Sequence, residues 1–571
     1  MRALSLIALA LAAASSVAAD NPVQALIDAA MADGRAQVTL PGGELRLDSG
    51  VLVDGAQDLV IDGGGSTLVF TNWRDGSIEL RACARVTLRD LTIDCDPLPF
   101  TQGTIVALSE DRSVWEFEVH DGYPTLTEDY LARQCYVYEP DRPRLRWGVP
   151  DIYPRSVEAL GERRGRITVS PQTPMLERVE VGDRIVLTIR GTAGVHLNTC
   201  ADVTLQDLTV RTCPGIAILG RYLIGNNVFR RLTIEPGPPP AGATQPRLMS
   251  ACAYGLNVAY ATRGPTIEDC RFRAQGDDSV NLHGPTLAVC AVEEGAVVLG
   301  WPYGGAPFER MVEPGAIVRG LRPGSFEIAG EAEIASIERV REVPEAWREV
   351  VQAMWPRREL GTGRFFRVAL DAPLPVAVGQ CADIPALACP GFVIRGCTFA
   401  DHRARGLRIM AAGGLIEGNT IERVQQAAIT IGAEYGFWRD AGWVSGVTVR
   451  GNTIRDVGRG ANLWSPTSYT LGAISVFGQP DDGFACAAGN RGIAIEGNTI
   501  DGCALAGIFV SCAHDVTIRG NTVAHTNYVR APDAGSRYGL TVSVPIDACR
   551  SENVTVAGNR IEHPNEAPPD G

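Results

Sequence analysis

The sequence predicts an all-β protein, a right-handed parallel β-helix (solenoid) into which two small antiparallel β modules are inserted. The first observation is a phrase that returns in the C-terminal third, as IEGNTI (416–421), VRGNTI (449–454), IEGNTI (495–500), IRGNTV (518–523) and VAGNRI (556–561). The second is a small residue followed by an apolar-polar-apolar triplet, which recurs throughout the chain, as in GIAI (215–218), GLNV (255–258), SVNL (279–282), GLRI (406–409) and GIFV (507–510). Short period-2 strands with Gly and Asn at the bends, and no helical periodicity between them, are typical of this fold.

The asparagine of the repeated GN pair sets the period of the repeat. The tightest interval is 521 − 498 = 23 residues, and longer intervals indicate one unit with an inserted loop. Asparagine suits such a bend because it tolerates the left-handed conformation and its side chain can bond to the backbone. Stacking these units predicts one long core of Val, Ile and Leu.

The chain begins MRALSLIALALAAASSVAAD, which has the form of a cleavable export signal over residues 1–19. Its apolar run is short for a membrane span, and no later stretch approaches the roughly 20 apolar residues that a spanning helix needs. We therefore expect a secreted or periplasmic protein without a membrane span.

The rest of the chain alternates between coils and insertions. Coil phrases such as VTLRDLTI (86–93) and VTLQDLTV (203–210) show that the solenoid runs through most of the chain. Two stretches rich in Arg, Glu, Trp and Pro break the period and carry alternating strands such as RGRITVS. The predicted order is coils at 20–100, a β module at 101–191, coils at 192–284, a β module at 285–390 and coils at 391–571.

The net charge of the chain limits the classes of molecule that it is expected to bind. The formal net charge of −14 argues against nucleic acid and anionic membranes, which require a basic face. A carbohydrate partner is compatible with this charge. No His, Cys and carboxylate set has ligand spacing, so no metal or organic cofactor is expected.

The cysteines follow the coil pattern. Fifteen cysteines form no compact disulfide framework, and several occupy apolar repeat positions, where we expect small buried hydrophobes. A disulfide between Cys503 and Cys512 remains an alternative.

The stretch AQGDDSVNLHG (274–284) carries two adjacent carboxylates, Asp277 and Asp278. Neighbouring coils lie about 4.8 Å apart, so aligned phrases show which side chains share a patch. The alignment places Tyr254 on one side of Asp278 and Arg405 on the other, with Arg403 beside Gly276 and Asn257 beside Asn281. A structural turn is one interpretation of the aspartates, and half of an acid/base pair is the other.

Further polar and aromatic residues surround this patch. His283 and Asn281 follow the aspartates on the same strand and are candidates for substrate binding. The stretch GAEYGFWRDAG (432–442) interrupts the repeat and brings Glu434, Trp438 and Asp440. Aromatic rings and carboxylates together suit the apolar face and the hydroxyls of a sugar, whereas an aromatic plug on the core is the structural alternative.

The order of these phrases is similar to that of the α-1,3-galactosidases of glycoside hydrolase family 110. The resemblance rests on LRDLTIDC, PRLMSACAYGLNVAYATRG, IEDCRFRAQGDDSVNLHG, RARGLRIM and EYGFWRDAG, with the two insertions between them. It implies an exo-acting, inverting enzyme that removes terminal α-1,3-linked galactose. It further implies that Asp277 and Asp278 activate the water, and that the general acid belongs at the position held here by Tyr254.

The expected function is therefore that of an exported β-helix glycoside hydrolase acting on terminal α-galactosides or a related sugar. Catalysis is assigned to Asp277, Asp278 and Tyr254, with an inserted-loop carboxyl or one member of the aspartate pair as alternative acids. Substrate binding is assigned to His283, Asn281, Arg403, Arg405, Glu434, Trp438 and Asp440. A polysaccharide lyase and a non-catalytic glycan-binding protein are the competing interpretations.

Overall fold

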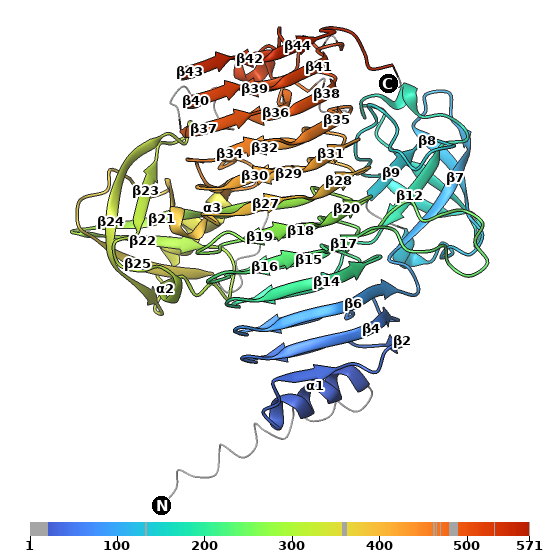
Figure 1. The fold of residues 1–571 in the computed structure, drawn as a ribbon, viewed down its shortest axis with the longest axis horizontal. Coiled ribbons are helices and arrows are strands. Elements are labelled where there is room, and N and C mark those ends of the chain that lie inside the picture. Colours follow the sequence, from blue (N-terminus) through green and yellow to red (C-terminus); the bar gives the residue numbers. More distant parts are fainter. Residues whose placement is uncertain are drawn as a thin grey trace, which may run out of the picture.

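The structure, a computed structural model, describes residues 21–569 except 132–133, 357–362, 461–462, 464, 469, 479–488 and 530. It is a right-handed parallel β-helix with two antiparallel β modules, so the predicted fold class is confirmed (Figure 1). The predicted export signal, residues 1–19, lies outside the described residues. In the part of the chain that the structure covers, no helix has the length and apolarity needed to cross a bilayer.

One parallel ladder of the β-helix includes the strand β21 (Val280–Glu293), which begins directly after the turn with the aspartate pair. It contains β3 (Val51–Asp54), β5 (Ile78–Arg81), β13 (Val195–Asn198), β15 (Ile218–Arg221), β18 (Leu256–Ala259), β21, β29 (Leu407–Ile409), β32 (Ile429–Ile431), β36 (Gly472–Val476), β39 (Ala506–Val510) and β42 (Ile546–Ala548). Along β18 and β21 the apolar positions Leu256, Val258, Val280 and Leu282 are fully buried, and they alternate with polar residues. This alternation fixes which side chains leave the core.

Two further parallel ladders complete the coils and share β4, β6 and β14. The first consists of β1 (Gln37–Thr39), β4 (Val60–Phe70), β6 (Thr87–Cys95), β14 (Thr204–Val210), β16 (Val228–Arg230), β19 (Thr266–Glu268), β27 (Val393–Arg395), β30 (Leu415–Glu417), β34 (Thr448–Arg450), β37 (Asn490–Glu496), β40 (Ala513–Arg519) and β43 (Glu552–Ala557). The second continues through β2 (Glu44–Leu47), β17 (Thr233–Ile234), β20 (Arg271–Arg273), β28 (Thr398–Ala400), β31 (Thr420–Glu422), β35 (Thr453–Val457), β38 (Thr499–Cys503), β41 (Thr522–Thr526) and β44 (Arg560–Glu562). The helix α1 (Pro22–Ala32) packs Val23, Ile27 and Ala30 against the first coils.

The two modules are antiparallel sheets with cores of their own. The first has the order β10 (Ser156–Ala159), β11 (Arg164–Thr168), β8 (Val114–Val119), β7 (Phe100–Leu108), β12 (Arg184–Thr188) and β9 (Gln134–Tyr138). The second comprises β22 (Ala296–Trp301), β23 (Ile317–Leu321), β24 (Ile328–Val340), β25 (Arg364–Leu370) and β26 (Cys381–Asp383), with the helices α2 (Phe308–Met311) and α3 (Glu345–Met354). Short 3₁₀ turns lie at Glu128–Tyr130, Leu176–Arg178, Pro385–Leu387 and Ser536–Tyr538.

The strand β21 belongs to both parts of the molecule. Its first residues pair in parallel with β18 and β29, and residues further along pair antiparallel with β22 and β26 of the second module. The short strand β33 (Asp440–Ala441) also pairs with β21, opposite Gly284 and Pro285. One strand thus joins the coil that carries Asp277 to the second module.

The repeated GN pair forms a buried asparagine ladder. The Asn498 Oδ1 accepts hydrogen bonds from the backbone N of Asn452 (3.0 Å) and from its Nδ2 (2.9 Å), and Asn498 in turn donates to Asn521. The side chain also donates to the Val449 carbonyl at 3.0 Å. The left-handed position is not the asparagine but the preceding glycine, with φ of 60° at Gly497 and 64° at Gly520. Our expectation that the asparagine adopts the left-handed bend is therefore wrong, because the glycine takes that conformation and frees the amide for bonding.

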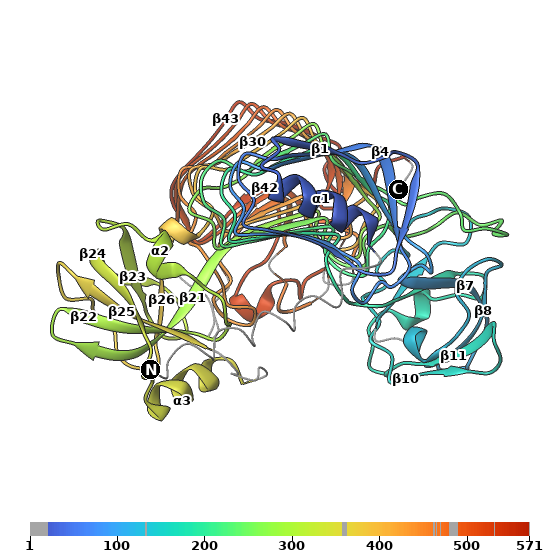
Figure 2. The ribbon, with the colours of Figure 1, turned by 90° about the horizontal axis from the view of Figure 1, so that it is seen from below.

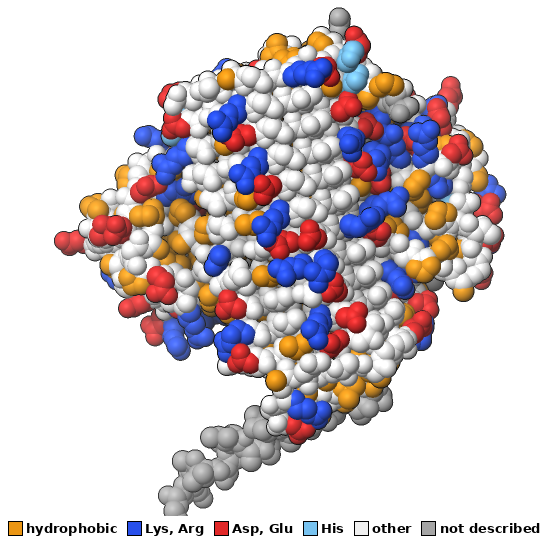
Figure 3. Space-filling view, viewed as in Figure 1, with side chains coloured by type: hydrophobic (Ala, Val, Ile, Leu, Met, Phe, Trp, Pro, Cys, Tyr) orange, Lys and Arg blue, Asp and Glu red, His pale blue; other side chains and the backbone are white. Residues whose placement is uncertain are grey.

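A column of alternating charges runs along one outer face. At the last position of the strands from β16 to β40 the residues are Arg230, Glu268, Arg395, Glu417, Arg450, Glu496 and Arg519. Figure 3 shows this column of basic and acidic side chains up the centre of the molecule. Each charge faces the opposite sign on the coil beside it, so this face compensates its own charges.

The described cysteines are all free, and all but Cys549 are buried. This confirms the expectation that they act as small buried hydrophobes. Cys503 and Cys512 are among them, so the alternative of a disulfide between these two residues is wrong.

Candidate active site

An open pocket of about 680 Å³ lies over the ladder of β15, β18, β21 and β29. Both modules stand on the same side of the β-helix (Figure 2), and each contributes to the pocket wall. The lining residues include Gln134, Tyr153 and Arg190 near the first module, Trp301, Tyr303 and Trp355 from the second, and Arg221, Tyr254, Asn257, Tyr260, Asp277, His283, Arg403, Arg405, Arg408, Trp438, Arg439 and Asp440.

The coil alignment predicted from the sequence agrees with the strand register. Asn257 pairs with Asn281 between β18 and β21, and Val280 pairs with Leu407 between β21 and β29. At the preceding turn the backbone N of Gly255 bonds to the carbonyl of Asp278, and that of Ser279 bonds to the carbonyl of Arg405. Tyr254, Asp278 and Arg405 are therefore stacked on consecutive coils.

Asp278 is enclosed in the protein. Its side chain is 0% exposed, and its two oxygens accept from the Arg405 backbone N (2.9 Å) and from Arg405 Nη2 (2.8 Å). Burial would raise the pKa of Asp278, but the charge and hydrogen bonds of Arg405 outweigh it and bring the pKa below its usual range. Asp278 is thus an ionised anchor for Arg405, away from the pocket surface.

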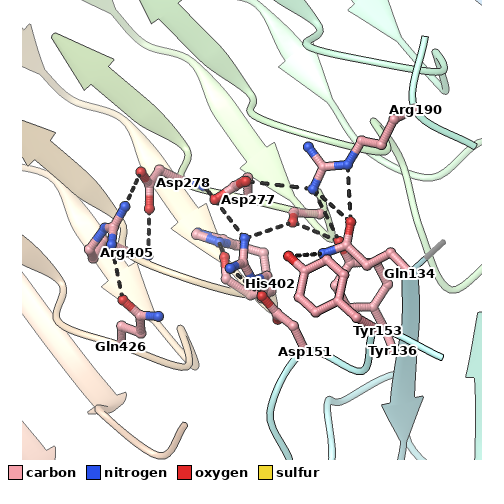
Figure 4. A network of polar contacts seen from close by, with 12 residues as sticks. Gln134, Tyr136, Asp151, Tyr153, Arg190, Asp277, Asp278, His402, Arg405 and Gln426 are labelled. Carbon is pink, nitrogen blue, oxygen red and sulfur yellow. Dashed lines mark hydrogen bonds and ion pairs between the residues drawn. The ribbon is translucent and has the colours of Figure 1, made fainter. Parts of the chain in front are cut away.

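Asp277 faces the pocket instead. Its side chain is 13% exposed, its Oδ1 lies 2.7 Å from Arg403 Nη1, and its Oδ2 lies 3.6 Å from Arg190 Nη2. Figure 4 shows the two aspartates turned toward different partners, Asp278 to Arg405 and Asp277 toward Arg190. Arg403 also pairs with Asp151 of the first module. Asp277 therefore lies where module and coil meet.

A close contact holds the first module against this turn. The hydroxyl of Tyr136, on β9, donates to the carbonyl of Gly276 at 3.0 Å. A Cβ at Gly276 would lie 2.4 Å from the Cys252 carbonyl oxygen, so no other residue fits there without displacement. The glycine before the two aspartates is required by this packing.

Tyr254 lines the pocket beside the aspartates. Burial and the charges of Asp277 and Asp278 raise its pKa well above the usual value. The phenol therefore stays protonated at any ordinary pH and can donate a hydrogen bond, but it is a weaker acid than free tyrosine.

His283 and Asn281 form a buried pair. The Nδ1 of His283 lies 2.9 Å from Oδ1 of Asn281, and both residues are at most 5% exposed. Burial and the charges of Arg221 and Arg408 lower the pKa of His283 well below its usual value, so the ring is neutral. His283 reaches the pocket, whereas Asn281 lies behind it and orients the imidazole.

The loop at 432–442 contributes some side chains to the pocket surface and others to the layer behind it. Glu434 is 3% exposed and pairs with Arg408, so it lies behind the pocket. Trp438 is 59% exposed at the rim, and the Asp440 side chain, 21% exposed, lines the pocket. Burial raises the pKa of Asp440 in spite of the charges of Arg408 and Arg221.

The second module supplies an aromatic wall that the sequence did not predict. Trp301 lies edge-on to Tyr260, with ring centroids 5.1 Å apart, and also contacts Tyr303 and Trp355. Arg190, Arg221 and Arg408 are further lining residues absent from the prediction. Arg408 occupies the outward position of GLRI in register with Asn281, so the coil alignment could have identified it.

Among the described residues, no group of three or more His, Cys, Asp or Glu side chains is arranged to hold a metal ion. The polar groups that line the pocket are guanidinium, phenol, imidazole, amide and carboxyl groups. These can bind hydroxyls and transfer protons.

Comparison with known proteins agrees with this architecture. A family described as a right-handed β-helix region matches residues 386–567. α-1,3-Galactosidase B of Bacteroides thetaiotaomicron is 24% identical over 90% of this chain and 80% of its own length. α-1,3-Galactosidase A of Bacteroides fragilis is 24% identical over 71% of this chain and 65% of its own length. These relatives support grouping the chain with glycoside-hydrolase-like β-helix proteins.

Solved structures match at low similarity. The A-module of the mannuronan C-5 epimerase AlgE6 of Azotobacter vinelandii is 11% identical, with a TM-score of 0.37 and coverage of 96% of this chain and 94% of that one. An exopolygalacturonase of Thermotoga maritima is 10% identical, with a TM-score of 0.36 and coverage of 95% and 87%.

Proposed function

We propose that the protein is a glycoside hydrolase that removes terminal α-linked galactose from glycans with inversion at the anomeric carbon. The proposal is supported by relatives that carry the name α-1,3-galactosidase and align with up to 90% of the chain. It is equally supported by the motif order of the sequence, in which the aspartate pair precedes the second module.

The observation that carries the proposal is the composition of the pocket. Aromatic rings from the second module line one side, arginines rise from the coils, and Asp277 reaches the space between them. Ring faces suit the apolar face of a pyranose, and guanidinium groups donate to its hydroxyls. A pocket of about 680 Å³ walled by two modules suits the end of a glycan chain better than its middle.

In the proposed reaction Asp277 is the general base. It holds a water molecule and takes one of its protons as the water attacks the anomeric carbon, a role that requires an ionised carboxylate at the pocket surface. Arg403 and Arg190 hold that carboxylate in position. Asp278 does not contact the sugar in this proposal. It contributes indirectly, because its ion pair holds Arg405 in the pocket wall.

The sugar itself would be bound by side chains from three parts of the chain. Arg403 and Arg405 rise from the coil beside the aspartates, Trp438 offers an exposed ring at the rim, and His283 closes the far side. Tyr254 would donate a hydrogen bond to a sugar hydroxyl. A galactose bound by these side chains would lie over the turn at Asp277.

The test is a product screen of α-galactosides followed by ¹H NMR of the active reaction. Inversion of an α-galactoside predicts that β-galactose appears first and α-galactose follows by mutarotation. Initial α-galactose would contradict inversion, and internal cuts with a fast drop in viscosity would contradict action at chain ends. An unsaturated product that absorbs in the ultraviolet would identify a lyase instead, and binding without turnover would identify a glycan-binding protein.

We further propose that the protein acts outside the cytoplasm. The support is the predicted export signal at residues 1–19. N-terminal sequencing of the protein from an exporting host is expected to start at or near Asp20, and an intact N-terminus on cytoplasmic material would contradict export.

A further inference from the structure

Two carboxyl groups line the pocket among the residues that the structure describes, those of Asp277 and Asp440. The neighbouring acids are turned away from it. Asp278 is 0% exposed against Arg405, and the Glu434 side chain is 3% exposed against Arg408. Asp151 pairs with Arg403 and lines a separate cavity of about 210 Å³. Apart from Asp277, the carboxyl group of Asp440 is therefore the candidate for the general acid among the described residues.

The backbone of Asp440 is held on two sides. β33 pairs with β21 at Gly284 and Pro285, and Asp440 exchanges two backbone hydrogen bonds with Glu434, at 2.9 and 3.1 Å. The side chain leaves this frame toward the pocket. Its Oδ1 lies 3.5 Å from His283 Nε2, and its Oδ2 lies 3.8 Å from Arg408 Nη2.

The tautomer of His283 bears on whether the neighbouring carboxyl group of Asp440 is protonated. The Asn281 Oδ1 can only accept, so the Nδ1 of His283, 2.9 Å away, is the nitrogen that carries the hydrogen. The neutral ring then presents the lone pair of Nε2 to Asp440. A carboxylate oxygen 3.5 Å from that nitrogen would set one lone pair against another, so the neutral ring disfavours the ionised form of Asp440.

The charges around Asp440 act in both directions. Arg408, Arg221 and Arg405 favour the ionised form, while burial and the charge of Asp278 favour the protonated form. Burial is the largest of these influences, and the pKa of Asp440 ends above its usual value. The raised pKa favours the protonated form of Asp440, which is the form that general acid catalysis needs.

We propose that Asp440 is the proton donor of the hydrolysis, with His283 as the positioning residue that fixes the Asp440 carboxyl group at the pocket; this rests on the function proposed above. The O–H bond of Asp440 breaks as its proton passes to the glycosidic oxygen. The bond from the anomeric carbon to that oxygen breaks, and its electron pair stays with the leaving sugar. Water bonds to the anomeric carbon and gives a proton to Asp277, and exchange with solvent then restores both carboxyl groups.

This assignment gives Tyr254 a different role from the one that the family resemblance implied. Its phenol lies at the rung of Asp278 and has a pKa above that of free tyrosine, which weakens it as an acid. Asp440 comes from the loop at 432–442, which interrupts the repeat.

The test is Asp440→Asn measured on two α-galactosides whose leaving groups differ in acidity. The asparagine can still donate an amide hydrogen to His283, so the variant is expected to fold. On α-1,3-galactobiose, whose leaving sugar needs a proton, kcat is expected to fall about 10²- to 10⁴-fold. On 2,4-dinitrophenyl α-galactoside, whose leaving group needs none, the loss is expected to stay below about tenfold, and the alkaline limb of the pH profile is expected to disappear.

Two matched variants separate this role from a structural one. Glu434→Gln changes a carboxyl of the same loop that lies behind the pocket, and Tyr254→Phe removes the phenol. Both are expected to change the rates on the two substrates by similar factors. Equal losses on both substrates in Asp440→Asn, or no loss on either, would overturn the assignment.

The proton itself can be measured without turnover. Infrared difference spectra between pH 5 and pH 8 are expected to show a protonated carboxyl band in the wild type that is missing in Asp440→Asn. Absence of that band from the wild type would overturn the assignment, even if α-galactosides are hydrolysed. If the band is present and the wild type hydrolyses no glycoside, the proposed function fails, and the result that Asp440 carries a proton stands.

Discussion

At the scale of single residues, Asp277 and Asp278 show how differently two neighbours in the chain can be placed. Asp277 meets the pocket and two arginines, while Asp278 is enclosed and bonded twice to Arg405. Removal of one partner from a buried ion pair leaves an uncompensated charge, which costs far more than loss of an exposed pair.

Asp278→Asn is therefore expected to lower the free energy of unfolding by about 3 kcal/mol, because the Arg405 guanidinium loses the carboxylate that bonds to it at 2.8 Å in a buried site. Asp277→Asn is expected to cost less than about 1 kcal/mol, since Arg403 keeps Asp151 as a partner. Urea unfolding monitored by circular dichroism measures both. Asp277→Asn is nevertheless expected to abolish turnover, and equal stability losses in the two variants would contradict the difference in burial.

The sequence located part of this site and missed the rest for a physical reason. Aligned coil phrases place Tyr254, Asp278 and Arg405 on one stack, because the strand register follows the repeat. Burial of Asp278 could not be predicted, since it depends on where the Arg405 side chain turns. Trp301 and Trp355 come from a module without a repeat, so no alignment could bring them to the pocket.

At the scale of elements, the asparagine ladder fixes the turns of neighbouring coils. Each side chain accepts from one coil and donates to the next, and it is buried, so its hydrogen bonds have no competition from water. The GN phrase in the sequence predicted the turn. It could not show that the glycine takes the left-handed conformation, because either residue tolerates it.

Asn498→Ala, in the middle of the ladder, is expected to lower the free energy of unfolding by about 2 to 4 kcal/mol, because Asn452 and the Val449 carbonyl each lose a buried partner. Asn559→Ala, in the last rung and less buried, is expected to cost clearly less. Denaturant midpoints of the two variants test this, and a similar loss in both would show that the ladder does not act through burial.

At the scale of the whole molecule, the free cysteines lie inside the β-helix and modules. The folded protein without reductant is expected to react with an alkylating reagent at few thiols, Cys549 first, because the other described cysteines are buried. The unfolded protein is expected to react at all of the described positions, again without reductant. Mass spectrometry counts the added groups, and a pair that reacts only after reduction would reveal a disulfide.

Acid is expected to weaken the fold through His120, a half-buried histidine of the first module. Burial lowers the pKa of His120 from 6.5 to about 4, so the unfolded chain binds a proton that the folded chain does not. The stability that His120 contributes is complete above pH 6.5 and is lost as pH falls toward about 4, at a slope of at most about 1.4 kcal/mol per pH unit. His120→Gln is expected to flatten the pH dependence of unfolding in that window, and an unchanged slope would exclude this histidine as a cause.

The continuity of β21 has a consequence for how a sugar enters and leaves. His283 sits on this strand before it continues into the second module, and Asp440 is attached to it through β33. A rigid-body rotation of the second module would therefore move the side chains of His283 and Asp440 away from Asp277. We therefore expect the wall of the pocket formed by the second module to stay fixed. Any widening of the pocket entrance for substrate or product should occur at the first module, which contacts the same turn through single side chains such as Tyr136.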